Sequence, residues 1–559
     1  MAMNRVLMIV LNRVALTVMF GFISMCAWSQ EQWERDGEIE DVEIEIVRER
    51  QITLPRANRN FEKVAPRPSE PIEPAITYEF RNLSFKTPDY NPSIRPLRLK
   101  QEDISKIYGN YVSAGYGNYA SPYLSAWFTT KRDKQRFIGA NIYHRSFGNG
   151  PVDDKNSASA NTEVKLFGKA FGPSVTAGGY VGYENRGGYF YGYTPGLETS
   201  RDSIKQSYNW FGLGGELTNT KPAEFNYKLA GSFGYLTDYY DAAESDLGIS
   251  FDSDYKIGDS NFIKVQSSYS LIARKDSLVD ANPRHLLKAK PSFQFQPIEG
   301  LKIEIGANLV LENDSIRSKS LHIYPAANAD FSLSKSVSLY GSLGGDIEKV
   351  NLRSLSSENL WVNSNIDIFH TNKTLELTAG LKGKVGSRAA FDVGFAAANL
   401  KDLYFYRNAA ADLAKFDVVY DRGNVQRINF FGQFGFNRNE VVRFNFRGDY
   451  YGYSTDQQPE AWHRPTYRVT ASTGFNVYQK LLIDVMLLGQ GGMKAFIDNT
   501  SEVVTLDPAL DLNVKASYLL SKQASVFVRF DNVLASDYPI FLNYPVRGFQ
   551  VMAGIGWSF

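Results

Sequence analysis

Apolar and polar residues alternate in short stretches that recur from about Tyr111 to the end of the chain. In the last stretch the apolar positions are Phe549, Val551, Ala553, Ile555, Trp557 and Phe559. Successive side chains of a β-strand point to opposite faces, so this stretch predicts a strand with one continuous apolar face. Such strands also occur in soluble sandwiches. The two terminal aromatics and the recurrence of the pattern favour a membrane barrel with an aromatic girdle.

The predicted strands are separated by connections of two kinds. Tight connections fall near residues 131–133, 172–173, 221–222, 258–259, 297–300, 334–336, 386–387, 437–439, 478–479 and 521–522. Long polar connections fall at 147–160, 186–206, 351–370, 402–424, 454–465 and 492–508. Short turns at one end and long loops at the other are typical of outer-membrane barrels. Together with a first strand at 111–118 and the closing strand, the turns predict about 22 strands, an even number as such barrels require.

The charged residues fall on one face of these strands. Leu301, Ile303 and Ile305, for example, alternate with Lys302 and Glu304. Arg or Lys against lipid at the midplane costs roughly 2–4 kcal/mol, so the charged face must line a wet or protein-filled lumen. In lipid every backbone polar group must be paired, and strands achieve this only in a closed barrel. We therefore predict an all-β protein, a transmembrane antiparallel β-barrel over residues 111–559.

Composition agrees with this interpretation and excludes others. Tyr (33), Phe (37) and Gly (45) are abundant, as expected for two aromatic belts and tightly packed, bent strands. The mean hydropathy of −0.30 argues against a bundle of membrane helices, whereas a barrel escapes this test because only alternate residues face lipid. Lys and Arg (61) balance Asp and Glu (60), so no bulk charge favours a nucleic acid partner.

Residues 1–29 are predicted to be a signal peptide. The mostly apolar run at 14–27 follows positive charges and is too short to span a bilayer as a helix. The Ala-Trp-Ser sequence at 27–29 fits a cleavage site that would leave Gln30 first. Lipoprotein processing at Cys26 is the less favoured alternative. Cys26 is the one cysteine of the sequence, so cleavage after residue 29 would exclude disulfide and thiolate chemistry.

Residues 30–75 form a predicted periplasmic tail that is acidic, then basic, then rich in proline. This composition predicts a largely disordered segment. The other interpretation is a short docking strand, in which Val42, Ile44 and Ile46 would add to the sheet edge of a periplasmic or lipoprotein partner.

Residues 76–110 lead directly into the first strand and carry apolar groups. Known transporter barrels of about 22 strands have a wide lumen that is plugged. We therefore expect something to narrow this lumen, and the candidates are residues 76–110, the long loops and the inward charged side chains. Of these, we predict that residues 76–110 fold at or in the periplasmic mouth of the barrel.

The end of the chain carries a local resemblance. Its segments read VRFDNVL at 528–534, DY at 537–538 and YPVRGF at 544–549, followed by the closing strand. They resemble the end of TonB-dependent receptors, and the sequence is similar in style to outer-membrane proteins of the Bacteroidota. The closing strand is also similar to the signal that the barrel assembly machinery reads. The predicted signal residues are Phe549, Val551, Ile555, Trp557 and Phe559.

The resemblance implies a barrel in the outer membrane of a Gram-negative cell, in contact with lipid and lipopolysaccharide. The N-terminus would be periplasmic and the long loops extracellular. The sequence departs from the family at one point, because residues 30–110 are too few and too polar for the plug domain that fills such receptors. We therefore expect a barrel without a plug.

The sequence contains no recognisable catalytic or metal-binding motif. Its five histidines, at 144, 285, 322, 370 and 463, form no close metal-ligating pair, so we predict neither enzyme activity nor a cofactor. The aromatic run at 189–193 suits an interfacial girdle or contact with a sugar or partner. The favoured function is a channel or receptor for solute uptake. The alternative is a structural subunit of an outer-membrane assembly or secretion complex.

Overall fold

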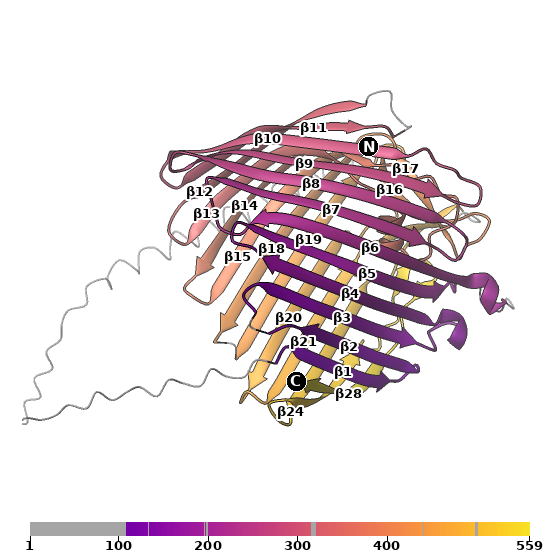
Figure 1. The fold of residues 1–559 in the computed structure, drawn as a ribbon. Coiled ribbons are helices and arrows are strands. Elements are labelled where there is room, and N and C mark those ends of the chain that lie inside the picture. The colour runs from indigo at the N-terminus through magenta and orange to yellow at the C-terminus, as the bar shows by residue number, and fades with distance from the viewer. Residues whose placement is uncertain are drawn as a thin grey trace, which may run out of the picture. The chain divides into compact units, whose positions relative to one another are not determined.

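A computed structural model describes residues 108–559 apart from 132, 195, 197–198, 315–319, 440 and 498–500. These residues form a closed antiparallel sheet of 22 strands (Figure 1). The sheet closes because the first strand pairs with the last. The predicted all-β fold class and the predicted number of strands are confirmed.

The barrel strands follow one another along the chain. The first part of the barrel contains β1 (Asn110–Gly117), β2 (Ser121–Thr129), β3 (Arg136–Phe147), β4 (Ser159–Phe171), β5 (Val175–Tyr189), β6 (Lys205–Asn219), β7 (Phe225–Thr237), β8 (Ala243–Ile257), β9 (Asn261–Lys275), β10 (Arg284–Ile298) and β11 (Leu301–Glu312). The second part contains β12 (Leu321–Ser332), β13 (Val337–Glu348), β14 (Thr371–Val385), β15 (Ala389–Lys401), β18 (Val425–Arg438), β19 (Val442–Ser454), β20 (Tyr467–Val477), β21 (Leu481–Gly491), β24 (Ala509–Leu519), β25 (Ala524–Asp531) and β28 (Gln550–Ser558).

The remaining elements lie in the connections between barrel strands. They are the short helices η1 (Asp154–Ser157), η2 (Arg201–Ile204) and α2 (Leu352–Glu358), and three strand pairs: β16 (Leu403–Asn408) with β17 (Phe416–Asp421), β22 (Lys494–Ile497) with β23 (Glu502–Thr505), and β26 (Pro539–Phe541) with β27 (Tyr544–Pro545). Within the described part of the chain, no helix has the length and apolar character needed to cross a membrane.

The two ends of the barrel differ as the sequence predicted. Each of the ten tight connections falls at a junction between consecutive barrel strands. The start of β1 and the end of β28 lie at this same end, which we call the turn end. The six long connections lie at the opposite end, the loop end. The connection between β25 and β28 also lies there, and it was not predicted from the sequence as a long loop.

The outer surface of the barrel is apolar. Its most exposed large side chains include Ile138, Ile323, Phe430, Ile555 and Trp557, each at least half exposed. On β11, Ile305 is exposed on the outer surface, whereas Glu304 on the opposite face pairs with Lys264 at 3.2 Å and accepts from Ser292 Oγ at 2.8 Å, in agreement with the predicted division of faces. A surface of this kind is suited to lipid, where the closed sheet leaves no unpaired edge.

The closing strand β28 is hydrogen-bonded to β25 on one side and to β1 on the other. In Figure 1 the yellow β28 lies beside the indigo β1. Asn110 and Phe559 exchange both backbone hydrogen bonds, of 3.0 and 3.2 Å. Phe559 meets Phe128 edge-on, with 6.5 Å between ring centroids. The structure thus places the end of the chain in the seam, while the role of these residues as an assembly signal stays a prediction.

Three predictions concern residues outside the described part of the chain. They are the signal peptide at 1–29, the tail at 30–75 with its docking strand at Val42, Ile44 and Ile46, and nearly all of the segment at 76–110.

Candidate functional site

A strap formed by residues 349–370 connects β13 to β14 at the loop end. Its short helix α2 begins at Asn351, whose side chain accepts a hydrogen bond from Ser354 N at 2.8 Å, and Ser354 Oγ accepts from Asn351 N in return. This reciprocal arrangement satisfies two backbone donors at the helix start. The buried carboxylate of Glu244 on β8 satisfies two more, Leu352 N at 2.7 Å and Arg353 N at 3.2 Å.

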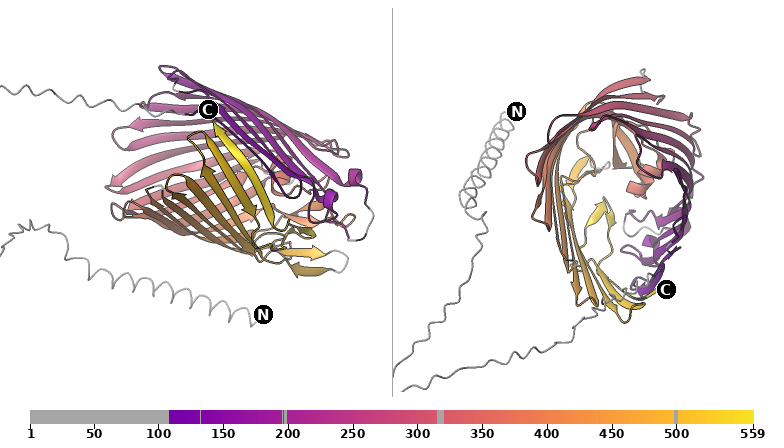
Figure 2. Two further views of the ribbon diagram at one scale, coloured as in Figure 1. Left: turned by 90° about the horizontal axis from the view of Figure 1, so that it is seen from below. Right: turned by 60° about the vertical axis from the view of Figure 1, so that its left-hand side comes forward.

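The strap also reaches β5 and β6, far from where it begins. The Arg353 guanidinium lies 3.5 Å from the ring centroid of Trp210 and pairs with Glu184 at 3.2 Å. Trp361 Nε1 donates to Tyr189 O at 2.9 Å. Counted around the barrel, β5 is eight strands from β13 (13 − 5 = 8). The strap therefore crosses the lumen instead of following its rim, as the right-hand view in Figure 2 shows.

Two polar clusters fix the rest of the strap. Arg274 donates to Ile366 O at 2.5 Å and is paired with Asp276 at 2.8 Å, and Asp276 accepts from Asn365 N at 2.7 Å. Asp314 accepts from His370 N at 2.6 Å. Because these partners are strongly buried, opening the strap would expose or unpair several charged groups, which is costly.

An aromatic cluster, the loop core, fills the space beside the strap. Trp361 packs on Tyr544 with ring centroids 3.9 Å apart, Tyr191 lies 4.7 Å from Tyr544, and Phe416 lies 5.2 Å from Phe541. These five residues come from four connections: β5–β6, β13–β14, β15–β18 and β25–β28. The Tyr544 hydroxyl donates to Ala414 O. Figure 2 shows loop segments within the outline of the barrel.

The protonation of the loop core is fixed by burial. Desolvation raises the pKa of Tyr191 to about 12 and lifts that of Tyr544 above its ordinary value. Desolvation also lowers the pKa of His463 to about 4 and that of His370, at the end of the strap, to about 3. The four side chains are therefore neutral at pH 7, as a packed core requires.

The residues of the C-terminal resemblance hold the last connection in place. Asn532 donates to Arg547 O and to Ser536 O, both at 3.0 Å. Arg547 in turn donates to Ser157 O and to Ser159 Oγ, both at 2.9 Å. The motif thus ties the connection between β25 and β28 to the one between β3 and β4.

The loop end is where the structure differs most from the sequence analysis. Residues 76–110 were favoured for narrowing the lumen, and this part of the prediction lies almost wholly outside the described residues. The long loops, considered only as another candidate, do enter the lumen. The aromatic run at 189–193 was expected at a lipid interface or a ligand, yet Phe190 and Tyr191 are buried in the loop core.

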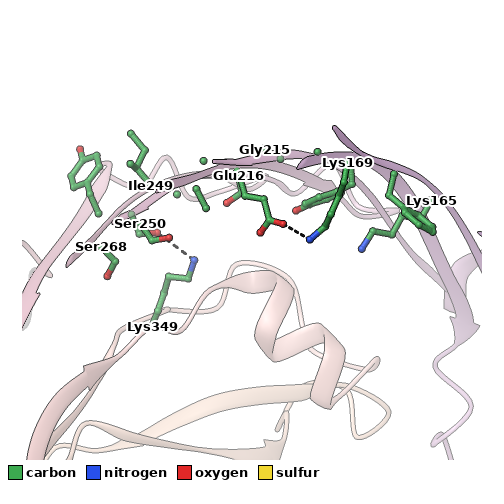
Figure 3. Close-up of a pocket in the computed structure, with 18 of the residues that line it drawn as sticks. Lys165, Lys169, Gly215, Glu216, Ile249, Ser250, Ser268 and Lys349 are labelled. Atoms are coloured by element: carbon green, nitrogen blue, oxygen red, sulfur yellow. Dashed lines mark hydrogen bonds and ion pairs between the residues drawn. The ribbon is translucent and has the colours of Figure 1, made fainter. Parts of the chain in front are cut away.

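Below the strap, on the side toward the turn end, the lumen contains a hollow of about 610 Å³ against β3 to β10. Figure 3 shows Lys349 reaching from the strap toward Ser268 and Ser250, and Lys165 and Lys169 extending from the wall. Small residues make up much of the wall here: Gly214, Ala230, Ser232, Gly248, Ser250, Ser268 and Ser270. The hollow exists because these side chains do not fill the space inside the sheet.

At several places on the lumen wall an aromatic ring lies over a glycine that stands opposite it on the next strand. Tyr180 is paired with Gly214, and a Cβ atom at Gly214 would come within 2.5 Å of its ring. The same arrangement recurs at Phe167 with Gly139, Tyr340 with Gly380, Phe431 with Gly394 and Phe527 with Gly554. A flattened ring presents its face, not its edge, to the lumen, so the lumen stays wide beside these rings.

The described residues contain no group of three or more His, Cys, Asp or Glu side chains placed to hold a metal ion. The predictions of no cofactor and no enzyme activity stay predictions.

No family model and no curated protein matches the chain. Solved structures match over most of their length. The FrpB iron transporter from Neisseria meningitidis (F3-3 variant) has 11% identity and a TM-score of 0.63 over 82% of each chain. The siderophore receptor PirA from Acinetobacter baumannii has 10% identity and a TM-score of 0.61 over 80% of each chain. The ferric enterobactin receptor PfeA in complex with BCV-L6 has 9% identity and a TM-score of 0.59 over 80% of this chain and 81% of that chain.

At these identities the likeness concerns the fold. The class that fold and site define is a 22-stranded barrel with a lumen capped by its own loops. The chain shares its barrel architecture with the two siderophore receptors and the iron transporter named above.

Proposed function

We propose that the protein is an outer-membrane receptor-like barrel that takes up a solute through its lumen. The observation that carries the proposal is the hollow beneath a cap of loops, because it combines a solute-sized space with a barrier that has to move. The likeness in fold to a siderophore receptor and to an iron transporter supports the same proposal. The protein is proposed to act without a cofactor and not as an enzyme.

The proposed location is the outer membrane of a Gram-negative cell, with lipid and lipopolysaccharide around the apolar outer surface. The turn end would face the periplasm and the loop end the exterior, the arrangement usual for such barrels. The barrel assembly machinery would insert the protein by reading β28. We also propose, from the charged and proline-rich composition of residues 30–110, that this segment does not form a plug domain and that its tail docks on a periplasmic or lipoprotein partner. The style of the sequence further suggests a protein of the Bacteroidota type.

The strap is the proposed gate. We expect the purified full chain to show low conductance in planar bilayers, because strap and loop core close the lumen. Replacing residues 351–368 by a short Gly-Ser linker should raise conductance at least several-fold. Shortening residues 498–501, in another connection of the loop end, is the control and should leave conductance low.

The packed loop core also favours a second candidate, a non-transporting structural subunit of an assembly or secretion complex, because a core of this kind can close a barrel permanently. The same experiment separates the two. If the barrel without the strap remains folded and conducts no more than the full chain, the uptake proposal is wrong and the structural role is favoured.

A further inference from the structure

The charged side chains that line the hollow beneath the strap are mostly cationic, although the chain as a whole has a formal net charge of only +1. Its charged lining side chains are Lys165, Lys169, Lys288, Lys349 and one carboxylate, Glu216. The charge facing this space is therefore positive.

The lysines differ in how their charge is balanced. Lys288 pairs with Asp346 at 2.7 Å and Lys349 with Asp246 at 2.6 Å. Glu216 is shared, since it pairs with Lys169 at 2.7 Å and with a further lysine, Lys228, at 3.3 Å. One carboxylate balances one of these two ammonium groups, so a positive charge remains.

Lys165 has no carboxylate of the described residues within ion-pair distance. Its ammonium group instead lies 4.6 Å from the ring centroid of Tyr180. A cation over an aromatic face is weakly held, at about 0.5–2 kcal/mol, so this ammonium group is available to an anion. In Figure 3 its side chain extends into the hollow.

The wall behind these charges is flat and largely apolar. Backbone groups in the sheet are already paired, so glycine positions present mainly Cα hydrogens. The rings of Tyr180 and Phe167 lie flat on the same wall, over Gly214 and Gly139. The hollow thus offers a platform for a flat apolar body, with ammonium groups at its rim, and its volume of about 610 Å³ is within the usual range for small-molecule sites.

We propose that the hollow binds a small organic anion, a carboxylate or sulfonate carried on a flat apolar ring system, with Lys165 and Lys169 on the acid group and Tyr180 on the ring. The inference rests on the proposed uptake function, because it names the class of solute that would pass beneath the strap.

The test is equilibrium binding to the purified full chain in a nonionic detergent, by titration calorimetry with naphthalene-2-carboxylate. The neutral naphthalene-2-carboxamide, which has the same ring body, is the matched ligand. We expect the carboxylate to bind at least tenfold more tightly than the amide, and added salt to reduce this difference because it screens the ammonium groups.

Two substitutions and one control substitution locate the site. Lys165→Gln should weaken carboxylate binding about tenfold and leave amide binding nearly unchanged. Lys515→Gln is the control, because Lys515 lies over the ring of Phe527 at 5.2 Å on another part of the wall, and it should bind as the unmodified protein does. Ser250→Phe should fill the hollow and abolish binding of both ligands. Retained heat-modifiable migration on gels shows that each barrel is folded.

Equal binding of carboxylate and amide, or equal losses in the two lysine variants, would overturn the proposal, as would the absence of saturable binding. Binding is measured without transport, so its result is separate from the conductance test. A strap that never opens would refute uptake while leaving an anion site, and a conducting barrel that binds no anion would refute only the site.

Discussion

At the residue scale, single buried groups decide whether the cap, which consists of the strap and the loop core, is stable. His463 is surrounded by the loop core: its Nδ1 donates to Tyr406 O at 2.8 Å, and its Nε2 accepts from Leu542 N at 3.3 Å. Both ring nitrogens are therefore used, and the ring has to be neutral. A proton on Nε2 would remove the acceptor that Leu542 N needs and would place a charge beside the neighbouring Arg464.

This arrangement predicts that acid opens the cap. Burial lowers the pKa of His463 to about 4, whereas in an opened cap it would return to about 6.5. Between these values the open form binds a proton that the closed form lacks. The neutral His463 ring thus stabilises the closed cap fully above about pH 6.5. This stabilisation is lost as the pH falls toward 4, by roughly 3 kcal/mol in total. Conductance should be low at pH 7.5 and rise by pH 4.5.

The pH response should shrink in His463→Gln. It should persist in His285→Gln, because that ring contacts Tyr269 outside the loop core. A response of equal size in both variants would show that the cap does not depend on His463.

At the element scale, neighbours determine what each segment contributes. Helix α2 has seven residues, too few to be stable alone. It persists because Asn351 caps it and Glu244 receives its first backbone donors. The closing strand β28 depends in the same way on β25 and β1, with Ile555 and Trp557 facing outward from the seam.

Replacing both Trp557 and Phe559 by Ser should leave the protein unassembled in the periplasm, since the closing strand loses the apolar end of its outer face. Membrane fractionation measures the outcome. The control is Phe430→Ser with Phe434→Ser on β18, which removes exposed aromatics of the same outer surface but not from the seam. We expect the control to assemble, and normal membrane levels of the β28 variant would contradict its role as the signal.

At the scale of the whole molecule, the lumen is closed at the loop end by segments that belong to the barrel itself. Narrowing at the turn end, by residues 76–110, is still a prediction. The closed strap would mask a second, partial barrier in series with it, so the contribution of the N-terminal segments becomes measurable only in a barrel without the strap.

In that background, deleting residues 30–75 should leave the barrel heat-modifiable and its conductance unchanged, while any periplasmic partner bound through Val42, Ile44 and Ile46 is lost. Extending the deletion through Tyr108 should raise conductance further. If the two deletions behave alike, the proposed division between a docking tail and a mouth segment is wrong.

The barrel could be predicted from the sequence, whereas the cap could not, and the difference has a physical reason. Alternation with a period of two is a local property, so strands such as β11 and turns such as 478–479 could be predicted one at a time. The loop core joins Tyr191, Trp361 and Tyr544, which are far apart along the chain and follow no period. The hollow depends on the register that sets Tyr180 opposite Gly214, and register is not visible in the pattern of either strand.

The composition of the loop core has a kinetic consequence. Tyr191 belongs to the connection after β5, whereas Tyr544 belongs to the one before β28, so their contact closes a loop of most of the barrel. Contacts of such long range form slowly unless other structure first brings the ends together. Pairing of β28 with β1 does this. Refolding should therefore occur in two phases, in which strand pairing precedes the burial of Trp361, and the newly inserted barrel should pass through an interval in which it is complete but still open.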